Sequence, residues 1–135
     1  MSGLNPPETR GITEWIGVFQ WEEHGESLLG DRHANLQQSW AMAHFNDFLA
    51  RYGELPAKVS KHSRFVTAPI GELAAWHIKQ FLTEFLPRAP RADVGDEWYV
   101  PTLAKFVQWL KDNRAISDEK HKELLSALTG IGTKH

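Results

Sequence analysis

Seven histidines are the residues of this chain most able to do chemistry, since imidazole titrates near neutral pH and binds transition metals. The nearest approach to a metal-ligand set is one short polar stretch: Glu23, His24, Asp31 and His33. No His-Glu-x-x-His motif is present, nor any Glu-x-x-His pair of the kind that builds di-iron bundles. We therefore favour a polar helix end followed by a solvated turn, and expect no cofactor.

His77 differs from the other histidines because it shares a helical face with Leu73, Ala74 and Phe81. A buried neutral imidazole needs a hydrogen-bond partner, and burial lowers its pKa. The pattern predicts a histidine at the edge of the core rather than a ligand or a catalytic base.

Motifs for nucleophilic or phosphate chemistry are missing from the sequence. There is no cysteine, no Gly-x-Ser-x-Gly elbow and no Gly-x-x-x-x-Gly-Lys-Ser/Thr loop. A catalytic function is therefore unsupported, and a metal-dependent enzyme using histidine and glutamate residues is the third hypothesis in rank.

Two short basic stretches indicate a possible contact with phosphates. Their cationic residues are Lys58, Lys61 and Arg64 in one, and Arg88 and Arg91 in the other. Basic and aromatic residues together on a loop are typical of single-stranded nucleic-acid binding. A nucleic-acid-associated protein is the second hypothesis, although we favour a solvated loop.

Three aromatic residues late in the chain are candidates for an anchor to a protein partner, including a second copy of this chain. They are Trp98, Tyr99 and Trp109, which flank the main apolar stripe of their predicted helix. The alternative is that all three belong to the core.

The elements that must position these residues are organised around residues 69–110. Apolar residues recur at spacings of three and four over 69–86, with Pro69 suited to a first helical turn and Pro87 to a stop. A second helix follows from Asp96 or Pro101. The fold class predicted is all-α, a single-domain bundle of four to five helices around this antiparallel hairpin.

Other segments follow from the same periodicity. A helix is favoured over a strand for residues 12–24, with Thr13 as its N-cap, and Gly53 should end a strong helix over 32–52. Residues 55–68 are expected to be irregular, and Ser117 should cap a last helix. The domain is expected to span 11–130, between flexible tails at 1–10 and 131–135.

Composition is that of an ordinary globular domain, with 41% hydrophobic and 24% charged residues and a net charge of −2. No signal peptide and no membrane-spanning stretch is recognisable, which predicts a cytoplasmic protein without membrane contact. Six tryptophans in 135 residues favour a non-enzymatic protein-interaction module that self-associates or binds a partner as the leading function.

Overall fold

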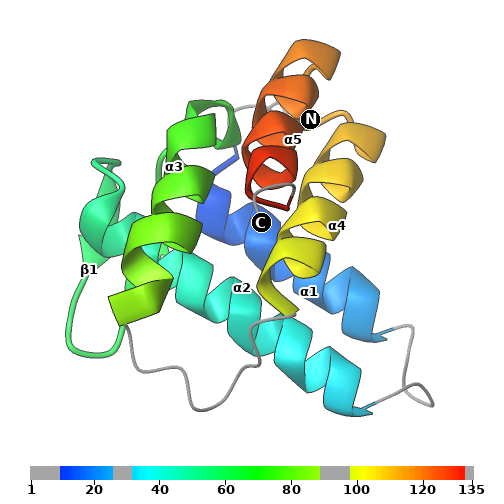
Figure 1. Ribbon diagram of the computed structural model, residues 1–135. Helices are drawn as coiled ribbons and strands as arrows, with labels where there is room; N and C mark the ends of the chain where they lie inside the picture. The colour runs from blue at the N-terminus through cyan, green and yellow to red at the C-terminus, as the bar shows by residue number, and fades with distance from the viewer. Residues whose placement is uncertain (1–9, 26–31, 89–97, 133–135) are drawn as a thin grey trace, which may run out of the picture.

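The computed structural model describes residues 10–25, 32–88 and 98–132, which form five α-helices and one two-stranded antiparallel sheet (Figure 1). The helices are α1 (Ile12–Gly25), α2 (Arg32–Tyr52), α3 (Ala75–Gln80), α4 (Tyr99–Asp112) and α5 (Asp118–Gly132). The strands are β1 (Ala57–Val59) and β2 (Arg64–Val66). The predicted all-α class is confirmed, because helices dominate and the sheet is small.

The two arms of the predicted 69–110 hairpin pack mainly on α5 rather than on each other, so the prediction of a directly packed helical pair is wrong. Helix α5 lies between α3 and α4 and packs against both (Figure 1). The arms also meet directly where the rings of Phe81 and Tyr99 contact edge to face, with centroids 5.8 Å apart. Phe81 is fully buried, as its place on the predicted apolar face requires.

The α-helix of the first arm starts later than the sequence predicts, because a 3-10 turn over Ile70–Glu72 precedes it. Pro69 is extended, with φ −60° and ψ 151°, and forms an isolated antiparallel bridge with Gly11. The Ile70 N–H donates to the Arg10 carbonyl over 3.0 Å, and α3 begins only at Ala75. The prediction that Pro69 opens the helix is wrong, because pairing with a segment distant in sequence overrides the local helical period.

Residues 55–68 were expected to be irregular, and this prediction is also wrong, because β1 and β2 form a hairpin there. Side chains from two helices hold it in place. The Thr13 hydroxyl accepts the Val66 N–H over 2.7 Å, and the Asn46 amide donates to the Arg64 carbonyl over 2.7 Å. Thr13 is thus a long-range anchor within α1 rather than the predicted N-cap, while the helix over 12–24 is itself confirmed.

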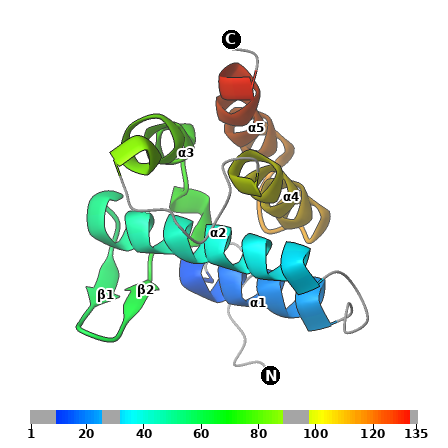
Figure 2. The same ribbon diagram turned by 60° about the horizontal axis from the view of Figure 1, so that its bottom comes forward.

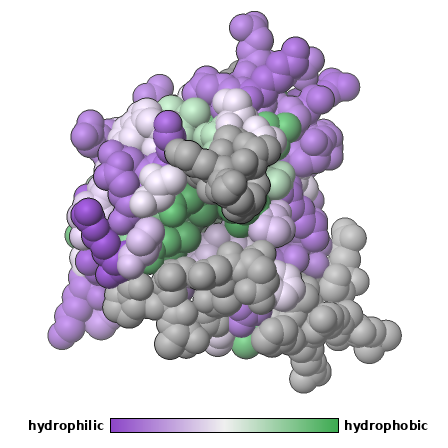
Figure 3. Space-filling view, in the orientation of Figure 1, coloured by the Kyte–Doolittle hydropathy of each residue, from purple (hydrophilic) through white to green (hydrophobic). Residues whose placement is uncertain are grey.

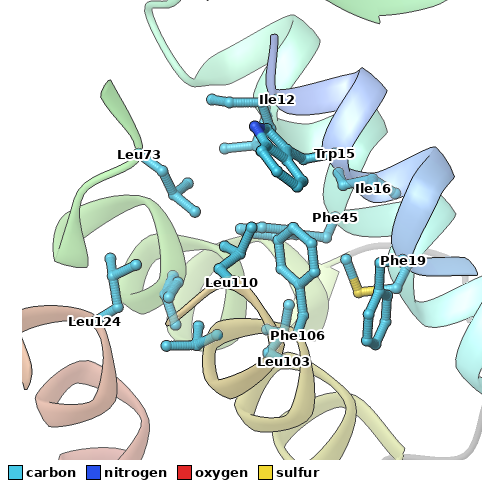
Figure 4. Packing of buried hydrophobic residues seen from close by; sticks show 14 of the residues in the cluster. Ile12, Trp15, Ile16, Phe19, Phe45, Leu73, Leu103, Phe106, Leu110 and Leu124 are labelled. Carbon is cyan, nitrogen blue, oxygen red and sulfur yellow. The ribbon is translucent and has the colours of Figure 1, made fainter. Parts of the chain in front are cut away.

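The core gathers apolar side chains from every helix, and Figure 4 shows them pointing toward one another between α1, α2 and α4. Four rings form what we call the interior aromatic cluster: Trp15, Phe19, Phe106 and Trp109. Their centroids lie 5.6 Å apart for Trp15 and Trp109, and 5.1 Å apart for Phe19 and Phe106. Edge-to-face contacts of this kind add to the stabilisation gained from burial.

The turn between α4 and α5 follows the predicted chemistry. The Ser117 hydroxyl accepts the Lys120 N–H over 3.1 Å, which confirms Ser117 as the cap of the last helix. His121 of this helix is buried, with Nε2 lying 3.2 Å from the Gln108 side-chain oxygen.

Candidate functional site

A surface groove of about 600 Å³ lies between the C-terminal half of α2 and the chain that follows α3. In Figure 2 this half of α2 runs between α3 on one side and the β1–β2 hairpin on the other. From α2 the groove is lined by Asp47, Phe48, Arg51 and Tyr52. From the opposite wall come Glu84, Phe85 and Arg88. We call this surface the aromatic groove.

Three rings of the aromatic groove touch one another. The Phe85 centroid lies 5.3 Å from that of Phe48 and 5.8 Å from that of Tyr52. Phe48 and Tyr52 are one turn apart on α2, so their rings share a face of the helix. Tyr52 is nevertheless 55% exposed, whereas Phe48 is buried. The rings therefore form an apolar wall that meets solvent mainly at Tyr52.

A π-helical turn over Phe81–Phe85 places Phe85 in this wall. Such turns are rare and occur often at functional sites. Pro87 has a local effect here, because proline has no N–H to continue the helical hydrogen bonds. The Thr83 hydroxyl donates to the Lys79 carbonyl over 2.7 Å, which also competes with regular helical bonding. A short 3-10 turn, Leu86–Arg88, then ends the wall.

The rim of the aromatic groove is charged. The Asp47 Oδ1 atom lies 3.2 Å from the Arg51 Nε and 2.9 Å from the Arg64 Nε, so one carboxylate serves two guanidinium groups. Arg64 also donates to the carbonyls of Ser60 and Ser63, which fixes the turn of the β hairpin. The rim is therefore partly ordered by contacts with the sheet.

His77 holds the two walls of the groove together at one end. Its Nε2 lies 2.9 Å from the Gly53 carbonyl oxygen, just beyond α2, and its Nδ1 accepts the Ala74 N–H over 2.9 Å. These partners require a neutral ring with the proton on Nε2. Burial lowers the pKa of His77, and the bond to Gly53 opposes that shift. The imidazole is thus a structural clamp, as the apolar face of its helix suggested.

The basic residues predicted to bind nucleic acid are only partly brought together. Lys58 and Lys61 are exposed on the β hairpin and its turn. Arg64 is held by Asp47, while Arg88 is exposed on the far wall of the aromatic groove. Arg91 lies outside the described residues. The two basic stretches, separate in sequence, therefore lie on either side of the same part of α2.

The predicted aromatic anchor does not present its rings to solvent. Tyr99 is 1% exposed and Trp109 9% exposed, and Trp98 is half-buried. The Trp109 indole N–H donates to the Glu22 carboxylate over 2.8 Å, and the Tyr99 hydroxyl lies 2.8 Å from His44 Nδ1. The prediction of a contact surface is wrong for Tyr99 and Trp109, because interior packing and hydrogen bonding engage both of them, while for half-buried Trp98 it stays a prediction.

The predicted metal-ligand set falls largely beyond what the structure describes. Asp31 and the side chains of His24 and His33 lie outside the described residues. Glu23 is described, and its carboxylate forms an ion pair with Lys105 of α4. Among the described residues, no three histidine, aspartate or glutamate side chains gather closely enough to hold a metal ion.

The groove residues Phe48, Tyr52 and Phe85 were missed as a site because the sequence placed them on apolar helical faces. One signal could have found them. Each of them lies within one or two turns of a residue that ends a helix, Gly53 or Pro87. Near such an end, the apolar face of a helix can extend beyond the neighbouring elements that cover the rest of it.

Figure 3 shows that hydrophobic residues surface on the face of α3 and α4 as well, within a hydrophilic surround. Comparison with known proteins adds no assignment, since no family model, curated protein or solved structure matches this chain. No helix in the described ranges is long and apolar enough to span a membrane.

Proposed function

We propose that this protein is a non-enzymatic interaction module whose aromatic groove accepts a short segment of a partner protein. The observation that carries the proposal is a cluster of three mutually contacting rings, in which Tyr52 is exposed, Phe85 is half-buried and Phe48 is buried behind them. Aromatic side chains dominate the energetics of protein interfaces because they bury large areas with few rotatable bonds. We expect this interaction in the cytoplasm, as the sequence suggests.

The dimensions of the groove support a peptide-sized occupant. Its volume of about 600 Å³ matches the space in which proteins hold small ligands or a few side chains. One large apolar side chain laid on Tyr52 would remove apolar surface from water on both partners, at roughly 25 cal/mol per Å². Recognition of nucleic acid has less support, because Arg64 is already committed to Asp47 and to the hairpin turn.

A displayed peptide library provides the test. Peptides are selected on the wild-type protein and then measured against Tyr52→Arg, which changes the groove, and Trp21→Arg, which changes an exposed ring on α1. We expect selected peptides to lose roughly tenfold or more in affinity for Tyr52→Arg and to keep their affinity for Trp21→Arg.

Two results would contradict the proposal. In the first, selection yields no peptide that distinguishes the two variants. In the second, light scattering shows a wild-type dimer that Tyr52→Arg dissociates, so that the occupant of the groove is a second copy of this chain rather than another protein.

A further inference from the structure

The charged side chains that line the aromatic groove balance one another. Asp47 and Arg51 line it from α2, and their charged groups lie 3.2 Å apart. Glu84 and Arg88 line it from the opposite wall. Two negative charges therefore accompany two positive ones. A charged occupant would be attracted by one member of each pair and repelled by the other, so the lining favours an occupant that carries no charge where it contacts the groove.

One polar side chain of the groove is uncommitted. Gln80, the last residue of α3, lines the groove, is half-buried, and forms no side-chain hydrogen bond within the described residues. A carboxamide accepts hydrogen bonds through its oxygen and donates them through its nitrogen. It can therefore pair with both the N–H and the C=O of a peptide backbone. A half-buried polar group without a protein partner is one that a ligand can satisfy.

The backbone of an incoming segment can use Gln80 only where its own polar groups are free. Inside a helix the N–H and C=O groups bond to one another, whereas an extended segment leaves them open. Successive side chains of an extended segment also point to opposite sides. One apolar side chain can therefore pack on Tyr52, the most exposed ring of the groove, while its neighbours in the segment point away.

From these observations we infer that the occupant of the groove is an extended segment of a partner protein, uncharged where it lies in the groove. One large apolar side chain of this segment packs on Tyr52 and Phe85, and one of its peptide groups is hydrogen-bonded to the Gln80 side chain. The inference rests on the proposed function and names the conformation and chemistry of the partner segment. Gln80 is the specificity-determining residue, because it distinguishes an extended backbone from a helical one.

The test measures the binding of small probes to the full chain by amide NMR. N-acetylphenylalanine methylamide supplies one ring, two peptide groups and no charge. Its matched probe carries an additional methyl group on each amide nitrogen and so cannot donate. We expect the methylamide to shift resonances of groove residues and to bind roughly fivefold more tightly than the matched probe, the effect of one net hydrogen bond. N-acetylphenylalanine, which carries a carboxylate, should bind no more tightly than the methylamide, because the lining charges balance.

Two variants with the same substitution identify the residue responsible. Gln80→Leu keeps a side chain of similar size and removes its hydrogen-bonding groups, so it should bind the methylamide and the matched probe equally. Gln38→Leu makes the same change on α2, outside the groove, and should keep the fivefold difference. Both positions are half-buried and helical, where leucine is well accommodated, and unchanged melting temperatures check that both variants fold.

Each contrary outcome overturns the inference and leaves the interaction module to be decided by the peptide selection. Equal binding of the two probes by the wild type removes the backbone contact, and a difference that survives in Gln80→Leu assigns that contact to another residue. Tighter binding of N-acetylphenylalanine means that the groove selects charge. A selected peptide that binds as a helix, seen by transferred nuclear Overhauser effects, rejects the extended segment. If no probe shifts groove resonances, the ligand chemistry is wrong.

Discussion

The interior aromatic cluster and the aromatic groove are built from the same kinds of residue, yet only the interior cluster is buried. Ring centroids in the interior cluster lie 5.1 to 5.6 Å apart for the pairs that join α1 to α4, and those in the groove lie 5.3 to 6.1 Å apart. Contact geometry therefore does not distinguish them. What differs is coverage, since α1 and α4 close the interior rings while nothing among the described residues covers Tyr52.

This difference in coverage determines whether a ring contributes mainly to folding stability or keeps surface for binding a partner. A ring closed on all sides contributes its full burial to folding, whereas a ring at an open edge contributes less and retains surface for a partner. Substitutions in the two regions should therefore change the free energy of unfolding by different amounts, and matched changes measure that difference.

The largest effect is expected for Phe106→Ala. Phe106 is fully buried and contacts Phe19, so truncation leaves a cavity and should lower the free energy of unfolding by about 3–5 kcal/mol. Tyr52→Ala is the matched change in the groove and should cost less than about 1 kcal/mol. Urea denaturation measures both, and equal losses would abolish the distinction between the two regions.

A smaller effect is expected at His77, which joins the two walls of the groove. His77→Phe leaves the Gly53 carbonyl and the Ala74 N–H without their partner, and should cost about 1–3 kcal/mol for each group left unsatisfied. Binding of groove peptides should weaken as well, because the two sides of the groove lose this hydrogen-bonded link and keep only their ring contacts. Unchanged binding in a folded variant would show that the groove holds its shape without the clamp.

The same histidine predicts a pH dependence. Burial lowers the pKa of His77 below its ordinary 6.5, helped by Lys120 and opposed by Glu54. The unfolded chain therefore takes up this proton at higher pH than the folded protein does. The contribution to stability is complete above about pH 6.5 and is lost as the pH falls below it.

Denaturation at a series of pH values checks the expectation. His77→Gln should flatten the slope below about pH 6.5, while His62→Gln, at an exposed turn, should leave it unchanged. A slope that survives His77→Gln would assign the effect to another group.

Much of the fold could be predicted because helical periodicity is local. The face that buries Phe81 and His77, the stop at Gly53 and the cap at Ser117 each depend on residues within a few positions. The β hairpin could not be predicted in this way. It depends on Thr13 and Asn46, which are distant in sequence. Which faces are covered by other elements is likewise non-local, and this is why Trp109 was offered as a surface anchor although the fold buries it.

Removing one polar atom from each aromatic region gives a finer comparison. Trp109→Phe deletes the N–H that donates to Glu22 and should cost about 1 kcal/mol, plus whatever the smaller ring loses in packing. Tyr52→Phe deletes an exposed hydroxyl and should change stability by no more than about 0.5 kcal/mol. A larger loss for Tyr52→Phe would mean that its hydroxyl is structurally engaged.

The smallest effect is expected on the β hairpin, beside the groove but outside it. Lys58 and Lys61 are exposed, so reversing both to glutamate should leave the melting temperature nearly unchanged, since exposed charges contribute little to folding. Arg64→Glu should cost more, because Arg64 contacts Asp47 and the hairpin turn.

The double variant Lys58→Glu, Lys61→Glu also tests the alternative function. A protein that uses this hairpin to hold phosphates would bind single-stranded nucleic acid in low salt, lose affinity steeply as salt is added, and lose it altogether in the double variant. We expect no such binding by the wild type at physiological salt, and unchanged affinity of the double variant for groove peptides. Salt-sensitive binding abolished by the reversal would move the functional surface from the aromatic groove to the hairpin.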